Sequence, residues 1–77
     1  MRVKLRGISV YSDLLGDLTE VEAEEGITVG ELISRIIPKR VEIEYGLVVF
    51  VNSIPSDNGR KLADGDIIEI APRFSGG

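Results

Sequence analysis

The sequence contains no cysteine and no histidine among its 77 residues. The absence of cysteine excludes a disulfide framework, a thiolate metal site and a catalytic thiol. The absence of histidine excludes imidazole catalysis and most zinc sites. Two tyrosines and two phenylalanines are the only aromatic residues, so aliphatic side chains must fill the core. An enzyme is therefore an unfavourable interpretation, although catalysis by Asp, Glu, Lys, Ser or Tyr stays open.

Long apolar runs and clusters of basic residues are also missing. No stretch approaches the roughly 20 apolar residues of a membrane span, and the first six residues alternate rather than form the apolar run of a signal peptide. The net charge is -4 and the nine basic residues are scattered, whereas phosphate binding needs them clustered. We therefore expect a cytoplasmic protein that binds neither membranes nor nucleic acid, and whose acidity suits a basic partner surface.

What is present is one small domain with a hydrophobic content of 43%, which indicates a packed core rather than disorder. Residues 2–10 alternate in polarity with a change of phase at Gly7, which predicts a first strand with a bulge. A turn over residues 13–16 is expected to lead into a second strand at 17–24. Its three glutamates share the outer face, which is either a solvated surface or a docking surface for a basic partner: Glu20, Glu22 and Glu24.

The clearest local signal is a helix start at Thr28. Thr28 and Glu31 fit the capping box, and Ile27 and Leu32 are placed to form the hydrophobic staple. The following apolar residues have the i, i+3, i+4 spacing of one helical face, and Pro38 predicts the end at about residue 37. The sequence therefore predicts one short amphipathic helix after two strands.

The second half predicts two more strands and a core plug. After a polar connection, residues 47–51 are apolar on both faces and predict a buried strand. Residues 53–60 are expected to be a loop, and Leu62 to fill the core from a short edge segment. Residues 64–66 form a turn signal before a last strand that ends at Pro72.

This order of elements predicts an α+β, β-grasp (ubiquitin-like) domain. A mixed sheet of four to five strands is crossed by one main helix, and the last strand returns to the middle of the sheet. We expect residues 1–72 to form the domain and residues 73–77 a flexible tail that ends in Gly76-Gly77.

Several segments resemble the MoaD/ThiS sulfur-carrier family. The resemblance rests on the helix start at 28–32, on Phe50-Val51-Asn52, on the segment 62–72 and above all on the ending Ser75-Gly76-Gly77. The overall length and Leu14-Leu15-Gly16 lean towards the MoaD side. The resemblance implies that a partner enzyme uses ATP to adenylate the Gly77 carboxylate, and that a sulfur donor then displaces AMP to leave a thiocarboxylate. The chain is then a carrier for molybdopterin or thiamine synthesis, with no catalytic residue and no bound cofactor or metal of its own.

The tail has the chemistry that this role requires. A free carboxylate is ionised and a poor electrophile at neutral pH, so it needs a leaving group. Two terminal glycines give a narrow chain end that can enter a closed active site, and five extended residues reach about 17 Å. Ser75, Phe74 and Arg73 are expected to bind the partner. Phe74 either anchors the tail in a partner pocket or folds back on its own sheet, and Arg73 either pairs with an acidic partner group or is solvated.

Partners and alternatives follow from the same terminus. We expect a monomer when free that binds an adenylating enzyme, a sulfur donor and a synthase large subunit. Its docking surface is expected on the sheet face opposite the helix, with candidates at Val10, Ile54 and one face of the 47–51 strand. Two alternatives stay open: a ubiquitin-like modifier joined to lysines through Gly77, and a β-grasp interaction module without terminal chemistry.

Overall fold

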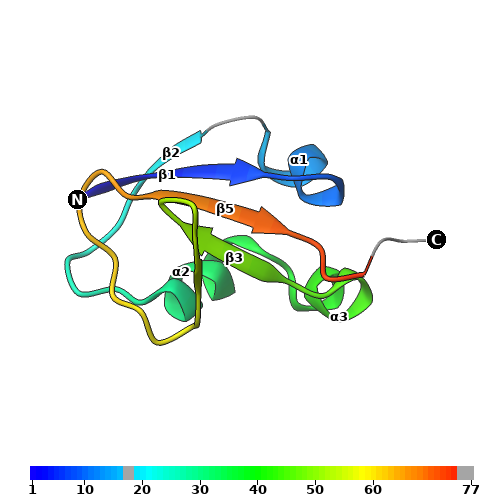
Figure 1. Ribbon diagram of the computed structural model, residues 1–77. Helices are drawn as coiled ribbons and strands as arrows, with labels where there is room; N and C mark the ends of the chain where they lie inside the picture. The colour runs from blue at the N-terminus through cyan, green and yellow to red at the C-terminus, as the bar shows by residue number, and fades with distance from the viewer. Residues whose placement is uncertain (17–18, 75–77) are drawn as a thin grey trace.

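The computed structural model describes residues 1–16 and 19–74 (Figure 1). Within these residues the chain forms five strands and three short helices. In chain order they are β1 (Arg2–Gly7), α1 (Val10–Leu15), β2 (Thr19–Glu22), α2 (Val29–Ile36), α3 (Lys39–Tyr45), β3 (Val48–Val51), β4 (Ile54–Ser56) and β5 (Ile67–Ala71). None of the helices in the described part of the chain is long and apolar enough to cross a membrane.

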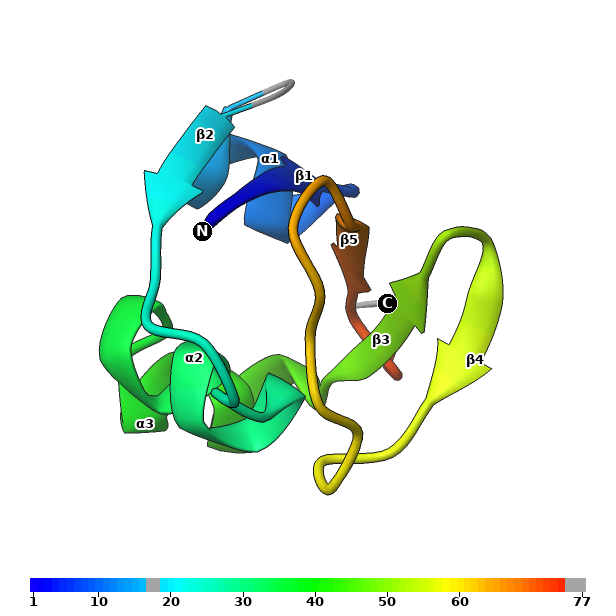
Figure 2. The same ribbon diagram turned by 90° about the vertical axis from the view of Figure 1, so that its left-hand side faces the viewer.

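The strands form one mixed sheet in the order β2-β1-β5-β3-β4. The last strand enters the middle, where β5 runs parallel to β1 and antiparallel to β3. In this central position Ile68 and Ile70 are fully buried. The backbone groups on both edges of β5 form hydrogen bonds with β1 and β3. Figure 2 shows the sheet end-on, with α2 on one side of it. The predicted β-grasp topology is confirmed.

The main helix is built as the sequence predicts. The hydroxyl of Thr28 accepts a hydrogen bond from the backbone N–H of Glu31 at 3.2 Å, and the Glu31 carboxylate accepts one from the backbone N–H of Thr28 at 3.0 Å. These bonds lower the pKa of Glu31, with the backbone bond as the main cause. Ile27 and Leu32 are both buried in the core, as expected for the staple residues.

The second half confirms the turn and the core plug. Leu62 is 5% exposed and lies beside an isolated bridge between Thr28 and Lys61. Gly65 has φ of +86° in the turn before β5. The buried carboxylate of Asp66 accepts hydrogen bonds from the Asn52 side-chain amide at 2.9 Å and from the backbone of Ala63 at 2.8 Å.

The first strand is shorter than predicted. β1 ends at Gly7, and residues 10–15, expected as strand and turn, form α1. A Cβ at position 7 would lie 2.1 Å from the carbonyl oxygen of Tyr11, so only glycine lets α1 fold back onto the strand end. Ser9 at the bend has φ of +57°. The change of phase at Gly7 therefore marks a chain reversal, not a bulge.

Two further elements were missed. The predicted polar connection forms α3, and the predicted loop contains the edge strand β4, which pairs only with β3. Pro55 is compatible with an edge strand because one side of its backbone needs no ladder partner. β3 alternates between buried and half-buried residues, so it is not enclosed on both faces as expected.

Candidate functional site

The end of β5 leads the chain back to α3. We call residues 72–74, which follow β5, the tail root. The backbone N–H groups of Arg73 and Phe74 both donate to the carbonyl oxygen of Tyr45, each at 3.0 Å. This carbonyl is one of those that a helix end leaves without an intrahelical partner. The tail root therefore supplies hydrogen-bond donors to the carbonyl end of α3. Figure 1 shows the last described residues passing beside this helix.

Gly46 makes this contact possible. Its φ is +70°, a conformation that favours glycine. A Cβ at this position would lie 2.7 Å from the Cβ of Arg73 and 3.1 Å from Cε2 of Phe74. The Phe74 ring therefore rests on the bare backbone of the α3–β3 turn while 55% of the residue stays exposed. Its neighbour in the chain's own fold is this turn rather than the face of the sheet.

A buried tyrosine holds the same turn from the other side. The hydroxyl of Tyr11, on α1, donates a hydrogen bond of 2.6 Å to the carbonyl oxygen of Gly46. Burial raises the pKa of Tyr11, and the nearby Glu42 carboxylate raises it further, so the phenol stays neutral and keeps its donor. Tyr11, Gly46 and the tail root thus join α1, α3 and β5 at one end of the molecule.

The sequence pattern singled out the residues of the tail but not the residues that contact it. Phe74 and Arg73 lie at this junction, whereas Ser75, Gly76 and Gly77 lie outside the described residues, so the activated terminus stays a prediction. Tyr11 and Gly46 were missed. The available signals were a tyrosine in a chain poor in aromatic residues and a glycine directly after an apolar i, i+4 pair, Val41 and Tyr45.

The outer face of the sheet, opposite α2, carries part of the predicted docking surface. Phe50 is half-buried there and pairs across the sheet with Glu69 on β5 and Pro55 on β4. The other two candidates lie elsewhere. Ile54 pairs with the fully buried Val51, so it shares the helix-side face at the sheet edge. Val10 lies on α1, because β1 has already ended.

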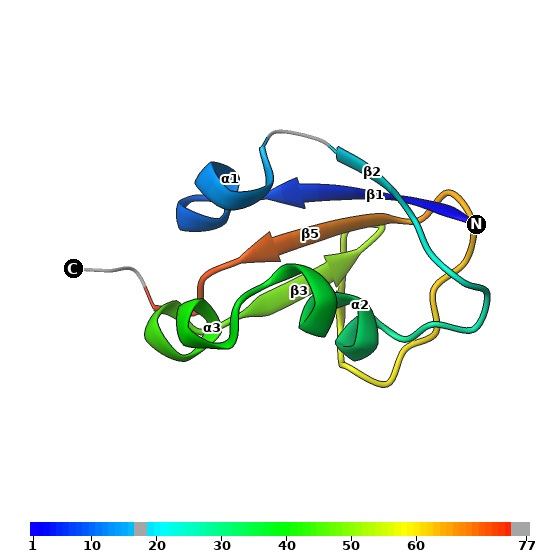
Figure 3. The same ribbon diagram turned by 180° about the vertical axis from the view of Figure 1, so that it is seen from behind.

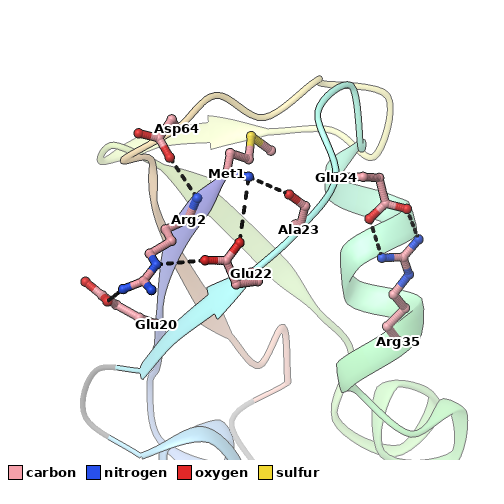
Figure 4. A network of polar contacts seen from close by, with 8 residues as sticks. All are labelled: Met1, Arg2, Glu20, Glu22, Ala23, Glu24, Arg35 and Asp64. Atoms are coloured by element: carbon pink, nitrogen blue, oxygen red, sulfur yellow. Dashed lines mark hydrogen bonds and ion pairs between the residues drawn. The ribbon is translucent and has the colours of Figure 1, made fainter.

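The predicted glutamate row is compensated by arginines of the same chain (Figure 4). Arg2 hydrogen-bonds Glu22 at 2.8 Å and lies 3.5 Å from Glu20, and the bond to Glu22 is the main cause of its raised pKa. Arg35 donates to Glu24 at 2.7 Å, which lowers the pKa of Glu24 to about 2. These pairings favour a solvated, internally neutralised face over a docking surface. Among the described residues, no group of three or more aspartate or glutamate side chains is placed to hold a metal ion.

A comparison with known protein families shows to which family the chain belongs. The sequence profile of the ThiS family matches residues 10–77 of the chain. The chain belongs to the ThiS family. No curated protein matches it.

Solved structures agree with this assignment. A Pyrococcus furiosus protein provisionally designated molybdopterin converting factor subunit 1 is 25% identical, with a TM-score of 0.79 over 94% of this chain and 97% of the other. Small archaeal modifier protein 1 of Haloferax volcanii is 17% identical, with a TM-score of 0.75 over 92% and 95%.

A third structure, a complex of subunits 1 and 2 of molybdopterin-converting factor from Helicobacter pylori 26695, gives 22% identity and a TM-score of 0.67 over 100% of both chains. The last two similarities concern the fold alone. All three cover nearly the whole of each chain, so the ThiS-family chain has the full β-grasp architecture of these proteins.

Proposed function

We propose that this ThiS-family protein is a sulfur carrier rather than an enzyme, and that its working group is the Gly77 carboxylate. The carboxylate attacks the α-phosphate of ATP in a partner enzyme and releases pyrophosphate. A sulfur donor then attacks the acyl adenylate, AMP leaves, and a thiocarboxylate remains. The observation that carries this proposal is the family match, which runs through the terminal diglycine at residues 76–77.

The tail root adds a physical argument. Because Arg73 and Phe74 bind the end of α3, only residues 75–77 are left to enter a partner. Three extended residues span at most about 10 Å. The partner's active site must therefore come close to α3, unless the tail root is pulled away from Gly46. Phe74 and Arg73 then contact both the chain's own turn and the partner.

We place the sulfur in molybdopterin synthesis, ahead of thiamine synthesis. The likeness to molybdopterin converting factor subunit 1 at 25% identity supports this order. The complex of two such subunits from another organism supports a synthase subunit as the recipient. The ThiS profile keeps thiamine synthesis as the other destination.

A ubiquitin-like modifier is the second candidate. It uses the same adenylated terminus, but a lysine amine attacks in place of sulfur and an isopeptide bond forms. The likeness to small archaeal modifier protein 1, with a TM-score of 0.75, favours keeping it. A plain interaction module, the third candidate, would need no terminal chemistry.

The decisive experiment is intact-mass analysis of the chain after incubation with the adenylating enzyme of the same genome, ATP and a sulfur donor. We expect exchange of one oxygen for sulfur at the terminus, and none when Gly77 is deleted. A Gly77 deletion variant that still supports cofactor synthesis would refute the carrier proposal. Conjugates that survive reduction and denaturation would instead identify the modifier.

Phe74→Ala separates the two interpretations of the tail. If Phe74 anchors the tail in the partner, its truncation lowers affinity for the adenylating enzyme by roughly one to two decades. If it serves only its own fold, affinity stays unchanged and the thermal midpoint falls.

A further inference from the structure

The two short helices α1 and α3 lie at the same end of the molecule as the tail root (Figures 1 and 3). Between them is an open groove of about 380 Å³, which we call the α1–α3 groove. Its apolar lining comes from both helices: Val10 and Leu14 on α1, Val41 and Tyr45 on α3. Leu14 is 45% exposed, a high value for a leucine inside a groove. The volume is at the lower end of the ~300–1,000 Å³ range of ligand sites.

The charged residues of the groove are not neutralised by ion pairs. Asp13, Arg40 and Glu44 line it, and within the described residues none of the three forms an ion pair. By contrast, five glutamates elsewhere on the surface are each paired with an arginine or a lysine: Glu20, Glu22, Glu24, Glu42 and Glu69. The groove therefore presents two carboxylates and one guanidinium to whatever enters it.

One of the two carboxylates also stands at an unfavourable position. Glu44 is in the last turn of α3, and this helix has no basic residue in its last turn. The carbonyl end of a helix carries partial negative charge and favours cations. Arg40 precedes Glu44 by four residues, which is the weaker order for a helical ion pair. An incoming cation would relieve this repulsion.

The groove lies next to the activated end of the chain. Tyr45 lines the groove, and its carbonyl oxygen accepts hydrogen bonds from the backbone N–H groups of Arg73 and Phe74. The residues beyond Phe74 reach at most about 10 Å. A protein that acts on Gly77 must therefore sit against this end of the molecule, where the groove is an apolar feature within reach.

We propose that the α1–α3 groove is a docking site for the enzyme that activates the C-terminus. Its occupant is a segment of that enzyme with an apolar side chain next to a lysine or arginine: the apolar group fills the space beside Leu14, and the cation meets Asp13 and Glu44. This inference rests on the proposed function, because it takes its partner from there. It adds a surface on the helices, separate from the outer face of the sheet.

The test compares two exposed apolar residues. Leu14→Glu places a charge in the groove, whereas Ile43→Glu places the same charge on α3 at a residue that is 71% exposed and lies outside the groove lining. Calorimetric titration with the purified adenylating enzyme should show binding weakened at least about tenfold by Leu14→Glu and unchanged by Ile43→Glu. Equal affinities for the two variants would overturn the proposal.

Charge reversals provide a second measurement at exposed positions, where misfolding is not expected. Glu44→Lys should weaken binding and Arg40→Glu should strengthen it, and both effects should shrink at high salt. Changes of the same sign, or none, would contradict a basic occupant.

Turnover distinguishes failure of the docking site from failure of the function. Groove variants should raise the KM for thiocarboxylate formation and leave kcat unchanged, whereas the Gly77 deletion should bind normally and give no product. Product formation without groove dependence would refute the docking site alone. Groove-dependent binding of the unaltered chain without any product would refute the carrier function alone, and absence of binding would refute both.

Discussion

The two ends of the sheet are held together by different kinds of interaction. At the end where β1 begins, exposed ion pairs join neighbouring segments, Arg2 with Glu22 and Glu24 with Arg35 (Figure 4). A capping box joins Thr28 with Glu31. At the end where β5 finishes, the hydroxyl of the buried Tyr11 and the absence of a side chain at Gly46 bring α1, α3 and the tail root together.

This difference separates a closed end from an open one. At the first end, arginines of the same chain pair with Glu20, Glu22 and Glu24. At the second end the backbone contacts are complete, but apolar side chains and carboxylates still face the solvent. The end that carries the tail thus exposes apolar and charged groups that can bind a partner, as the proposed function requires.

The largest effect is expected for Gly46→Ala. Alanine must adopt a positive φ and its Cβ meets the Cβ of Arg73, so we expect a loss of about 2–4 kcal/mol in the free energy of unfolding. Gly65→Ala is the matched control, since Gly65 has φ of +86° but open space around it, and strain alone should cost about 1–2 kcal/mol. Urea unfolding measures both. Equal losses would show that the tail root does not press on Gly46.

A smaller effect is expected for Tyr11→Phe. Removal of the hydroxyl leaves the Gly46 carbonyl without its 2.6 Å donor, which should lower stability by about 1–2 kcal/mol. Tyr45→Phe should change little, because within the described residues the Tyr45 hydroxyl makes no hydrogen bond. Thermal unfolding of the two variants compares them directly. A larger loss for Tyr45→Phe would mean that Tyr11 does not hold the turn.

The smallest effect belongs to the closed end and depends on pH. The hydrogen bond from Arg35 lowers the pKa of Glu24 from 4.5 to about 2, so the pair stabilises the fold fully above pH 4.5 and the contribution disappears as the pH falls through about 2. Glu24→Gln should therefore lower the thermal midpoint slightly at neutral pH, and the difference from the unaltered chain should vanish near pH 2. Glu25→Gln, at an adjacent acid without an ion pair in the described residues, should show no such convergence.

Local patterns in the sequence predicted the parts that depend on neighbours in the chain. The capping box at Thr28 and the glycine turn before β5 each involve residues within about one helical turn, and both are present. The second strand also forms, but β2 covers only Thr19–Glu22, and Thr19 is exposed although it was predicted on the inner face with Val21. The central position of β5 was also predictable. Its isoleucines must be buried, and the middle of the sheet, covered by the helix, is where a last strand can bury them.

The errors occurred where a distant contact overrides the local pattern. Residues 8–10 alternate like a strand, but Tyr11 approaches Gly7, so the chain bends at Ser9 and α1 begins at Val10. Residues 39–45 lack a side-chain cap, so the helical signal of α3 was weak and its packing decides the outcome. β4 is three residues long and exists through its pairing with β3.

For the candidate site, the sequence by itself is the source of the proposed chemistry, because it lacks cysteine and histidine, contains Gly76-Gly77 and matches the ThiS family. Only the tertiary structure decided what surrounds that tail. Tyr11 lies 35 residues before Gly46, and Gly46 lies 27 residues before Arg73 of the tail root. They meet through the hydroxyl of Tyr11 and the absence of a side chain at Gly46. No local spacing rule encodes such contacts, because they depend on how α1, α3 and β5 stack at one end of the sheet.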